Sequence, residues 1–291
     1  MLQESHLAEM RQTEVLPSGT SSYLELLKIV LTDYHPAIKT ELYSLEQVKD
    51  TWKIRALKQL DKLLKTRNFT ISKVKTVLPE IRENGYDWPA NAYTMVGINR
   101  LTNIEHCIKS ILQRNIKGDF VEAGIWRGGA VIFMKAVLKE LAIKERRIWV
   151  ADSFRGLPKP SKNFAADATN KLYLEKILSV SKAAVKNNFS RFGLLDSSII
   201  FLEGLFKETL PVAPINKIAL LRLDCDMYES TITVLNNLYQ KVSDGGFIIV
   251  DDYHSFKECK LAVDDYRKEW GIEEPIIEID KEAVFWKKNR N

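Results

Sequence analysis

Residues 119–141 read DFVEAGIWRGGAVIFMKAVLKEL, and this stretch indicates the fold class. A short apolar run ends at Gly124, and Gly128 and Gly129 then open a segment with the apolar periodicity of a helix. Strands that alternate with helices in this way predict an α/β fold with a mostly parallel sheet covered on both faces, and two closely spaced runs near the end predict a hairpin. The further strand-like runs are RIWVAD (147–152), SSIIFLEG (197–204), IALLRLD (218–224), GFIIVDD (246–252), PIIEID (275–280) and AVFWKK (283–288).

Composition sets the broad class. The chain has 291 residues, of which 45% are hydrophobic and 28% charged, as in ordinary globular proteins. Its apolar runs are shorter than the roughly 18–20 residues of a membrane span, and its polar start lacks the apolar core of a secretory signal. The three cysteines form no CxxC pair, so we expect a reduced, cytoplasmic protein. The net charge of +5 comes from interleaved basic and acidic residues, which predicts no nucleic-acid or membrane partner.

The first part of the chain has a different texture. Residues 1–20 are polar and turn-rich and are expected to be mobile, and residues 23–84 have a helical, charge-rich pattern. One helix face is expected to carry the apolar residues Trp52, Leu57, Leu60, Leu63 and Leu64. We interpret the lysines and arginines between them as the solvated face, in preference to a surface for an anionic partner. Residues 1–90 are therefore expected to form a helical extension, and residues 91–291 the α/β domain.

Acidic residues follow the predicted strands. Ligands of parallel sheets gather beyond the carboxyl ends of the strands, so this convergence indicates a functional site. The carboxylates at or near those ends are Glu122, Asp152, Asp224, Asp226, Asp251 and Asp252.

The turn VEAGIWRGG and the strand after it indicate the kind of ligand. The turn lacks the GxGxxG spacing of dinucleotide-binding proteins, which disfavours a nicotinamide-dependent oxidoreductase. Glu122 would repel a pyrophosphate but suits an ammonium group, and Asp152 suits two ribose hydroxyls. S-adenosylmethionine carries both groups. The alternative is a tight loop between strand and helix, with an acid that caps the next helix.

The other acids indicate a cation. Asp224 and Asp226 are two residues apart and are expected to share one side of an extended strand. The strand that ends in Asp251 and Asp252 is its expected neighbour, and oxygen ligands favour Mg²⁺ or Ca²⁺, with Mn²⁺ as a substitute. In the alternative, Asp251 and Asp252 cap a helix and Asp224 pairs with Arg222. A cation beside a methyl donor predicts that a coordinated hydroxyl loses its proton to a free carboxylate and attacks the methyl group.

Seven stretches of the chain resemble one known family, the macrocin O-methyltransferases, which are Mg²⁺- and S-adenosylmethionine-dependent enzymes that methylate sugar hydroxyls of macrolides and aminocoumarins. The resemblance spans about residues 90–288 and implies a Rossmann-like class I methyltransferase fold, with a seven-stranded, mostly parallel sheet and an antiparallel hairpin at its end. The matching stretches are AYTMVGINRLTNIEHC, DFVEAGIWRGGAVIFMKAVL, WVADSFRGLPKP, NNFSRFGLLDSSIIFLEGLFKETLP, LRLDCDMYEST, GGFIIVDDY and AVDDYRKEWGI.

The resemblance also implies roles for individual residues. It makes Asp224, Asp251 and Asp252 the metal ligands and Asp226 the catalytic base, with His254 as the alternative base. Asp196 is expected near the adenine. The residues that fall where the family holds the cofactor are Met95, Glu122, Gly124, Trp126, Asp152, Ser153 and Asp196.

Two departures from the family pattern bear on the function. Cys225 stands where the family usually has glycine; strand alternation points it away from the acids, and we interpret it as a packing residue. The N-terminal region matches more weakly, and in the family it forms the lid, the acceptor pocket and the dimer contact, so we expect a homodimer or higher oligomer. The acceptor is expected to be a sugar or polyketide hydroxyl, free or tethered to a carrier. The competing hypothesis is an inactive binding protein with the same fold.

Overall fold

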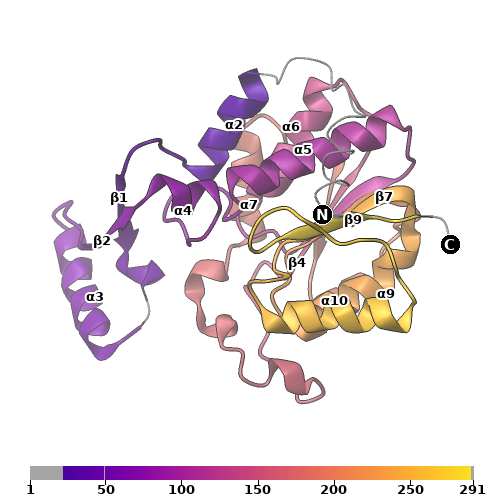
Figure 1. The fold of residues 1–291 in the computed structure, drawn as a ribbon. Helices are drawn as coiled ribbons and strands as arrows, with labels where there is room; N and C mark the ends of the chain where they lie inside the picture. Colours follow the sequence, from indigo (N-terminus) through magenta and orange to yellow (C-terminus); the bar gives the residue numbers. More distant parts are fainter. Residues whose placement is uncertain (1–21, 49, 290–291) are drawn as a thin grey trace.

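The computed structural model describes residues 22–48 and 50–289, and the labels of helices and strands follow Figure 1. The expectation that residues 1–20 are mobile lies outside these residues. Within them, no helix is both long and apolar enough to cross a bilayer.

A seven-stranded sheet forms the centre of the molecule, in the order β5-β4-β3-β6-β7-β9-β8. Strands β3 to β7 are parallel, whereas β9 runs antiparallel to both β7 and β8. The predicted parallel sheet and C-terminal hairpin are therefore confirmed. The strands are β3 (Asp119–Ala123), β4 (Ile148–Asp152), β5 (Ile199–Glu203), β6 (Ile218–Leu223), β7 (Val242–Val250), β8 (Ile277–Glu278) and β9 (Val284–Lys287).

Helices cover both faces of this sheet (Figure 1). Successive strand residues point to opposite sides, so that Val150 packs in one apolar cluster and Trp149 in the other. Two buried faces explain why the strands read as continuous apolar runs. One cluster includes α2 (Ser22–Thr32), α5 (Ile98–Gln113), α6 (Gly129–Glu140) and α7 (Lys182–Arg191), and the other α8 (Phe206–Thr209), α9 (Tyr228–Leu238) and α10 (Lys257–Glu269).

The direction of chain winding reverses between β3 and β6, because β4 and β5 lie on one side of β3 and β6 and β7 on the other. The ends of these two strands touch closely. The Asp224 N–H donates to the Ala123 carbonyl over 2.9 Å. Gly124 has a φ of +83°, and a Cβ added there would lie 1.8 Å from the Asp224 carbonyl oxygen. Such a reversal is where open α/β sheets bind their ligands.

The N-terminal extension is less helical than its sequence pattern predicts. Strands β1 (Lys39–Ser44) and β2 (Ser72–Val77) pair as an antiparallel two-stranded sheet, with α3 (Trp52–Lys65) between them along the chain and α4 (Pro79–Glu83) after them. The helical prediction is wrong for β1 and β2. The alternation in SKVKTV was the available signal, but the residues of this strand pair with residues 28 to 38 positions away, which local periodicity does not show.

Helix α2 belongs to the core, whereas α3 does not. Leu24, Leu27 and Leu31 of α2 are buried in the cluster that contains α5 and α6, and Lys28 pairs with Glu105 over 2.8 Å. In Figure 1, α3 lies with β1 and β2 at the left edge of the molecule, away from the large sheet. Four of the five residues of the predicted apolar stripe of α3 are exposed in the single chain, with Trp52 at 75%, and Leu64 is half-buried.

Candidate active site

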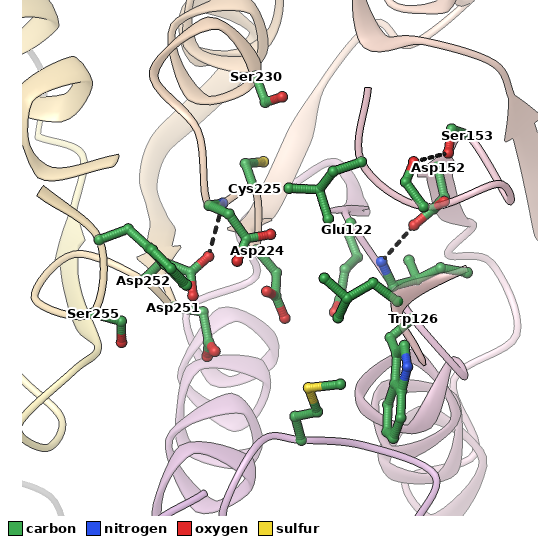
Figure 2. A pocket seen from close by; sticks show the side chains of 18 of the residues that line it. Glu122, Trp126, Asp152, Ser153, Asp224, Cys225, Ser230, Asp251, Asp252 and Ser255 are labelled. Atoms are coloured by element: carbon green, nitrogen blue, oxygen red, sulfur yellow. Dashed lines mark hydrogen bonds between the residues drawn. The ribbon is translucent and has the colours of Figure 1, made fainter. Parts of the chain in front are cut away.

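The carboxyl ends of the central strands border a cavity of about 400 Å³ (Figure 2). It lies where the chain reverses between β3 and β6. The structure brings together at this cavity ten of the eleven predicted site residues: Met95, Glu122, Gly124, Trp126, Asp152, Ser153, Asp224, Asp226, Asp251 and Asp252.

Glu122, near the end of β3, has one free buried oxygen. Its Oε1 accepts a hydrogen bond from Arg222 over 2.5 Å, while its Oε2 is buried with no hydrogen-bond partner in the described part of the chain. Burial raises the pKa of Glu122 to about 8, and the Arg222 guanidinium opposes that rise. A buried acceptor without a partner at a cavity wall suits a ligand that donates hydrogen bonds, such as an ammonium group.

Asp152, the last residue of β4, is fixed by the backbone. Its Oδ1 accepts from the Phe154 N–H over 2.6 Å and its Oδ2 from the Ile125 N–H over 3.0 Å. Burial raises the pKa of this carboxyl, and these two hydrogen bonds oppose the rise. Neither donor begins a helix, so Asp152 is not the helix cap of the alternative interpretation. Each oxygen keeps a second lone pair for a hydroxyl donor.

Trp126 and Ser153 shape the walls of the cavity. Trp126 has a left-handed φ of +46°, and its indole N–H donates to the Ile177 carbonyl over 2.8 Å. Ser153 does not offer a free hydroxyl, because its Oγ donates to the Gly156 carbonyl over 2.7 Å. The Trp126 bond therefore holds the segment after β4 against the turn after β3, whereas the Ser153 bond closes a turn within that segment.

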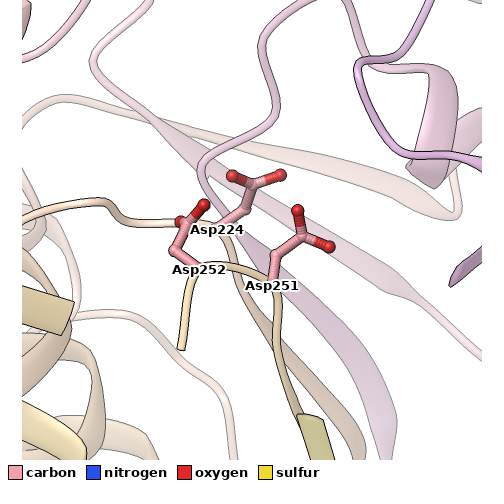
Figure 3. A group of neighbouring side chains, drawn as sticks. All are labelled: Asp224, Asp251 and Asp252. Atoms are coloured by element: carbon pink, nitrogen blue, oxygen red, sulfur yellow. The ribbon is translucent and has the colours of Figure 1, made fainter. Parts of the chain in front are cut away.

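The other half of the cavity is acidic. One carboxylate oxygen from each of Asp224, Asp251 and Asp252 lies within 4.8 Å of the others (Figure 3). The helix-cap alternative is wrong for Asp251 and Asp252, because α10 has Phe256 as its N-cap and no side-chain capping bond. Three converging carboxylate oxygens are the donor set that a hard divalent cation prefers.

Two buried arginines hold the acids, and sequence reasoning missed one of them. Arg222, fully buried, contacts Glu122, Asp224 over 3.1 Å, and Asp251. The alternative pairing of Arg222 with Asp224 is thus present within the acid cluster. Arg100 of α5 donates to Asp251 over 2.8 Å. Burial would raise the pKa of Asp251, but Arg100 and Arg222 outweigh it and hold that pKa below its ordinary value.

Asp226 reaches the cavity by a turn. Strand β6 ends at Leu223, and Asp226 has a left-handed φ of +57°, so the expectation that strand alternation places it beside Asp224 is wrong. Its N–H donates to Asp252 Oδ2 over 3.1 Å. Burial, followed by the charges of Asp224 and Asp251, raises the pKa of Asp226 to about 8.

The residue between the first two aspartates packs inside the fold. Cys225 is buried in an apolar cluster, and its Sγ donates to the Ala123 carbonyl over 3.4 Å. Burial raises the pKa of this thiol well above its ordinary value. Both observations agree with a packing role.

Asp196 is the predicted site residue that the structure does not bring to the cavity. It precedes β5 and so lies at the amino-terminal ends of the parallel strands, away from the cavity at their carboxyl ends. There it pairs with Lys135 over 2.7 Å. Its assignment to the cofactor site is therefore corrected. The residues 204–206, which follow β5, line the cavity instead, and the rule of strand ends could have found them. His254 is exposed, is not among the lining residues, and pairs with Glu278 over 3.0 Å.

Comparison with known proteins places the chain in a family. The family model of Macrocin-O-methyltransferase (TylF) matches residues 20–288. The chain belongs to the macrocin O-methyltransferase family. It is an O-methyltransferase, and the match includes the N-terminal extension, where the sequence resemblance was weaker.

Three curated members of the macrocin O-methyltransferase family are similar over most of the chain. Demethyldecarbamoylnovobiocin O-methyltransferase of Streptomyces niveus is 47% identical over 74% of this chain and 83% of its own length. A 4'-O-methyltransferase of Streptomyces olivaceus, named for 8-demethyl-8-(2,3-dimethoxy-alpha-L-rhamnosyl)-tetracenomycin-C, is 48% identical over 70% and 78%. Mycinamicin III 3''-O-methyltransferase of Micromonospora griseorubida is 45% identical over 72% and 84%.

Solved structures agree with this assignment. The O-methyltransferase NovP superposes with a TM-score of 0.76 at 40% identity, over 92% of this chain and 98% of NovP. The calicheamicin methyltransferase CalS11 superposes with a TM-score of 0.54 at 19% identity, over 82% of this chain and 94% of its own, a likeness of fold alone.

Proposed function

We propose that this O-methyltransferase transfers a methyl group from S-adenosylmethionine, with Mg²⁺ or Mn²⁺ bound, to a hydroxyl of a glycosylated natural product or polyketide. One observation carries the proposal. The free Oε2 of Glu122 and the oxygen cluster of Asp224, Asp251 and Asp252 border one cavity, at the ends of the neighbouring strands β3, β6 and β7.

The residues present fit both groups. Glu122 Oε2 would accept a hydrogen bond from the amino group of S-adenosylmethionine, and Asp152 would accept from its ribose hydroxyls. Asp224, Asp251 and Asp252 would hold the cation. When bound, S-adenosylmethionine supplies an electrophilic methyl group, and the cation supplies the charge that lowers the pKa of a nearby hydroxyl.

We assign the removal of the hydroxyl proton to Asp226. Its carboxylate lines the cavity, and no hydrogen bond from residues 22–48 or 50–289 ties it down. A base works best with a pKa near the working pH, and burial, followed by the charges of Asp224 and Asp251, raises the pKa of Asp226 above its ordinary value. Proton removal by a positioned base contributes roughly 10²–10⁴-fold to a rate. His254 is poorly suited, since its ring nitrogen contacts Glu278 outside the cavity.

The acceptor class rests on the relatives, whose names describe methyl transfer to a novobiocin precursor, a rhamnosyl tetracenomycin and mycinamicin III. The aromatic side chains Tyr86 and Trp88 and the hydroxyl of Ser255 line the cavity, together with the acids. Flat apolar surfaces beside polar groups suit a sugar ring attached to a larger scaffold.

A transfer assay tests this function. Isotope-labelled S-adenosylmethionine is offered with a panel of glycosylated natural products that lack one O-methyl group, with Mg²⁺ or with excess chelator. We expect label in a sugar-bearing acceptor, and at least a tenfold loss with chelator. An arm with acceptors loaded on a carrier protein distinguishes free from tethered substrates. Binding of S-adenosylhomocysteine without transfer to any member of the panel would contradict the proposed acceptor class.

We also propose that the exposed unit of β1, α3 and β2 contacts a second copy of the chain. Leu42 and Val74 face each other across the two strands and are 60% and 61% exposed, and Leu63 of α3 is 66% exposed. A two-stranded sheet with so much exposed apolar surface is marginal on its own. Light scattering should give a dimer or larger mass for the protein, and a smaller mass for Leu63→Glu. Val212→Glu is the control, because Val212 lies before β6, outside this unit, and is 79% exposed.

A further inference from the structure

The segment between β4 and α7, residues 153–181, forms one wall of the cavity. Gly156, Leu157, Lys159 and Leu178 from this segment line it. The segment contains three short 3₁₀ turns but no α-helix or strand. A wall of this length without regular structure must be held in place by a few specific contacts.

Asp167 provides one such contact. It ends the 3₁₀ turn Ala165–Asp167 and is 0% exposed. Its Oδ1 accepts from the Tyr228 N–H over 2.8 Å and its Oδ2 from the Glu229 N–H over 2.9 Å. These are the first two residues of α9, whose own N-cap, Met227, makes no side-chain capping bond. A carboxylate 61 residues away in sequence therefore caps this helix, and its charge also suits the positive end of the helix dipole.

The helix that Asp167 caps begins immediately after the turn of Asp226. Asp226 is held on one side by its N–H bond to Asp252, and two residues later the chain is fixed by Asp167. The first turns of α9 also supply Glu229 and Ser230 to the cavity. The Phe164 ring packs on the Tyr228 ring, with centroids 5.8 Å apart, which reinforces the same junction.

We propose that Asp167 is a positioning residue that ties the 153–181 wall to the start of α9 and thereby fixes the Asp226 turn in the cavity. The two walls carry different functions, because the 153–181 segment follows Asp152 on the cofactor side and α9 follows the acids. Asp167 joins them through two hydrogen bonds to backbone groups. The kinetic part of this inference rests on the proposed role of Asp226, whereas the structural tie does not.

Two variants test the tie without acceptor or cation. Asp167→Ala removes both bonds, and Asp167→Asn keeps one acceptor oxygen and loses the charge. Trypsin can cut the segment after the exposed residues Lys162, Lys171 and Lys176. We expect Asp167→Ala to be cut there at least tenfold faster than the unchanged protein, and to bind S-adenosylhomocysteine several-fold more weakly. Asp167→Asn should have a cleavage rate and an affinity between those of Asp167→Ala and the unchanged protein. If Asp167→Ala does not fold, Asp167→Asn takes its place in the comparison.

Ser181→Ala is the matched control. Ser181 caps α7 by accepting the Ala184 N–H over 3.2 Å, so this variant also loses a helix cap but leaves the wall and α9 joined. We expect it to lower Tm without changing cleavage between Lys162 and Lys176. Equal cleavage rates in the Asp167 variants and Ser181→Ala would overturn the tie.

Turnover then tests the positioning of Asp226. At saturating S-adenosylmethionine, Asp167→Ala should lower kcat at least tenfold, whatever its effect on the KM of the acceptor. Ser181→Ala should leave kcat unchanged. Faster cleavage with an unchanged kcat would overturn the positioning role, although the tie would stand. Failure of the proposed function would look different, because the unchanged protein would then show no methyl transfer while cleavage still distinguished the variants.

Discussion

The two halves of the cavity hold their carboxylates by different means. On the side where we propose that the cofactor binds, Asp152 is fixed by backbone N–H groups of Ile125 and Phe154. On the acidic side, Asp251 is fixed by the guanidinium groups of Arg100 and Arg222. Backbone donors are neutral and belong to the turn itself, whereas arginines bring charge from other elements. The comparison teaches that Asp152 is held in place without any charge, whereas Glu122 shares Arg222 with Asp224 and Asp251 and so takes part in the balance of charges of the second half.

Removal of Arg222 should break this balance and gives the largest expected effect. Arg222→Met leaves Glu122, Asp224 and Asp251 without their shared buried partner. Removing one partner of a buried ion pair lowers the free energy of unfolding by about 3–5 kcal/mol. Urea denaturation of the variant and the unchanged protein measures this loss. Lys182→Met removes the partly exposed pair with Glu203 and should cost less than about 1 kcal/mol. Equal losses for the two variants would show that Arg222 does not hold the acidic half.

The acids of the second half should divide into two groups when each is changed to asparagine. Asp224→Asn, Asp251→Asn and Asp252→Asn should each weaken Mg²⁺ affinity and raise the concentration needed for activity. Asp226→Asn should leave metal affinity nearly unchanged and lower kcat by roughly 10²-fold or more. Calorimetric titration with Mg²⁺ and metal-dependence curves of turnover measure both quantities. Should excess Mg²⁺ restore Asp226→Asn, that residue is a metal ligand, and His254→Asn is the next variant to measure.

The smallest effect is expected when the cation is removed and binding of S-adenosylhomocysteine is measured. S-adenosylhomocysteine should bind with less than a twofold change in Kd when excess chelator is added, because Glu122 and Asp152 are held without a metal ion. Calorimetric titration measures this. Asp152→Asn is the positive control and should weaken binding in both conditions. Loss of all binding with chelator would show that the two halves are not separable.

Sequence reasoning succeeded where one rule applies locally. Parallel strands place the residues at their carboxyl ends together, which located Glu122, Asp152, Asp224 and Asp251. The same rule excludes Asp196, which precedes its strand, and only the family resemblance had suggested it. Arg100 and Asp167 could not be predicted, because each acts on a segment far away along the chain, 151 and 61 residues from its partner. The turn of Asp226 was also hidden, because strand alternation holds only while the backbone stays extended.

The placement of α2 has a consequence for protein engineering. A chimera that exchanged residues 1–90 with a relative, in order to change the acceptor, would remove Leu24, Leu27 and Leu31 from the core and separate Lys28 from Glu105. Lys39 and Val77 face each other at one end of the β1–β2 pair. A graft of residues 39–77 would therefore have both its junctions side by side and leave α2 with its own partners. The useful unit of exchange is therefore β1, α3 and β2 together, rather than the whole extension.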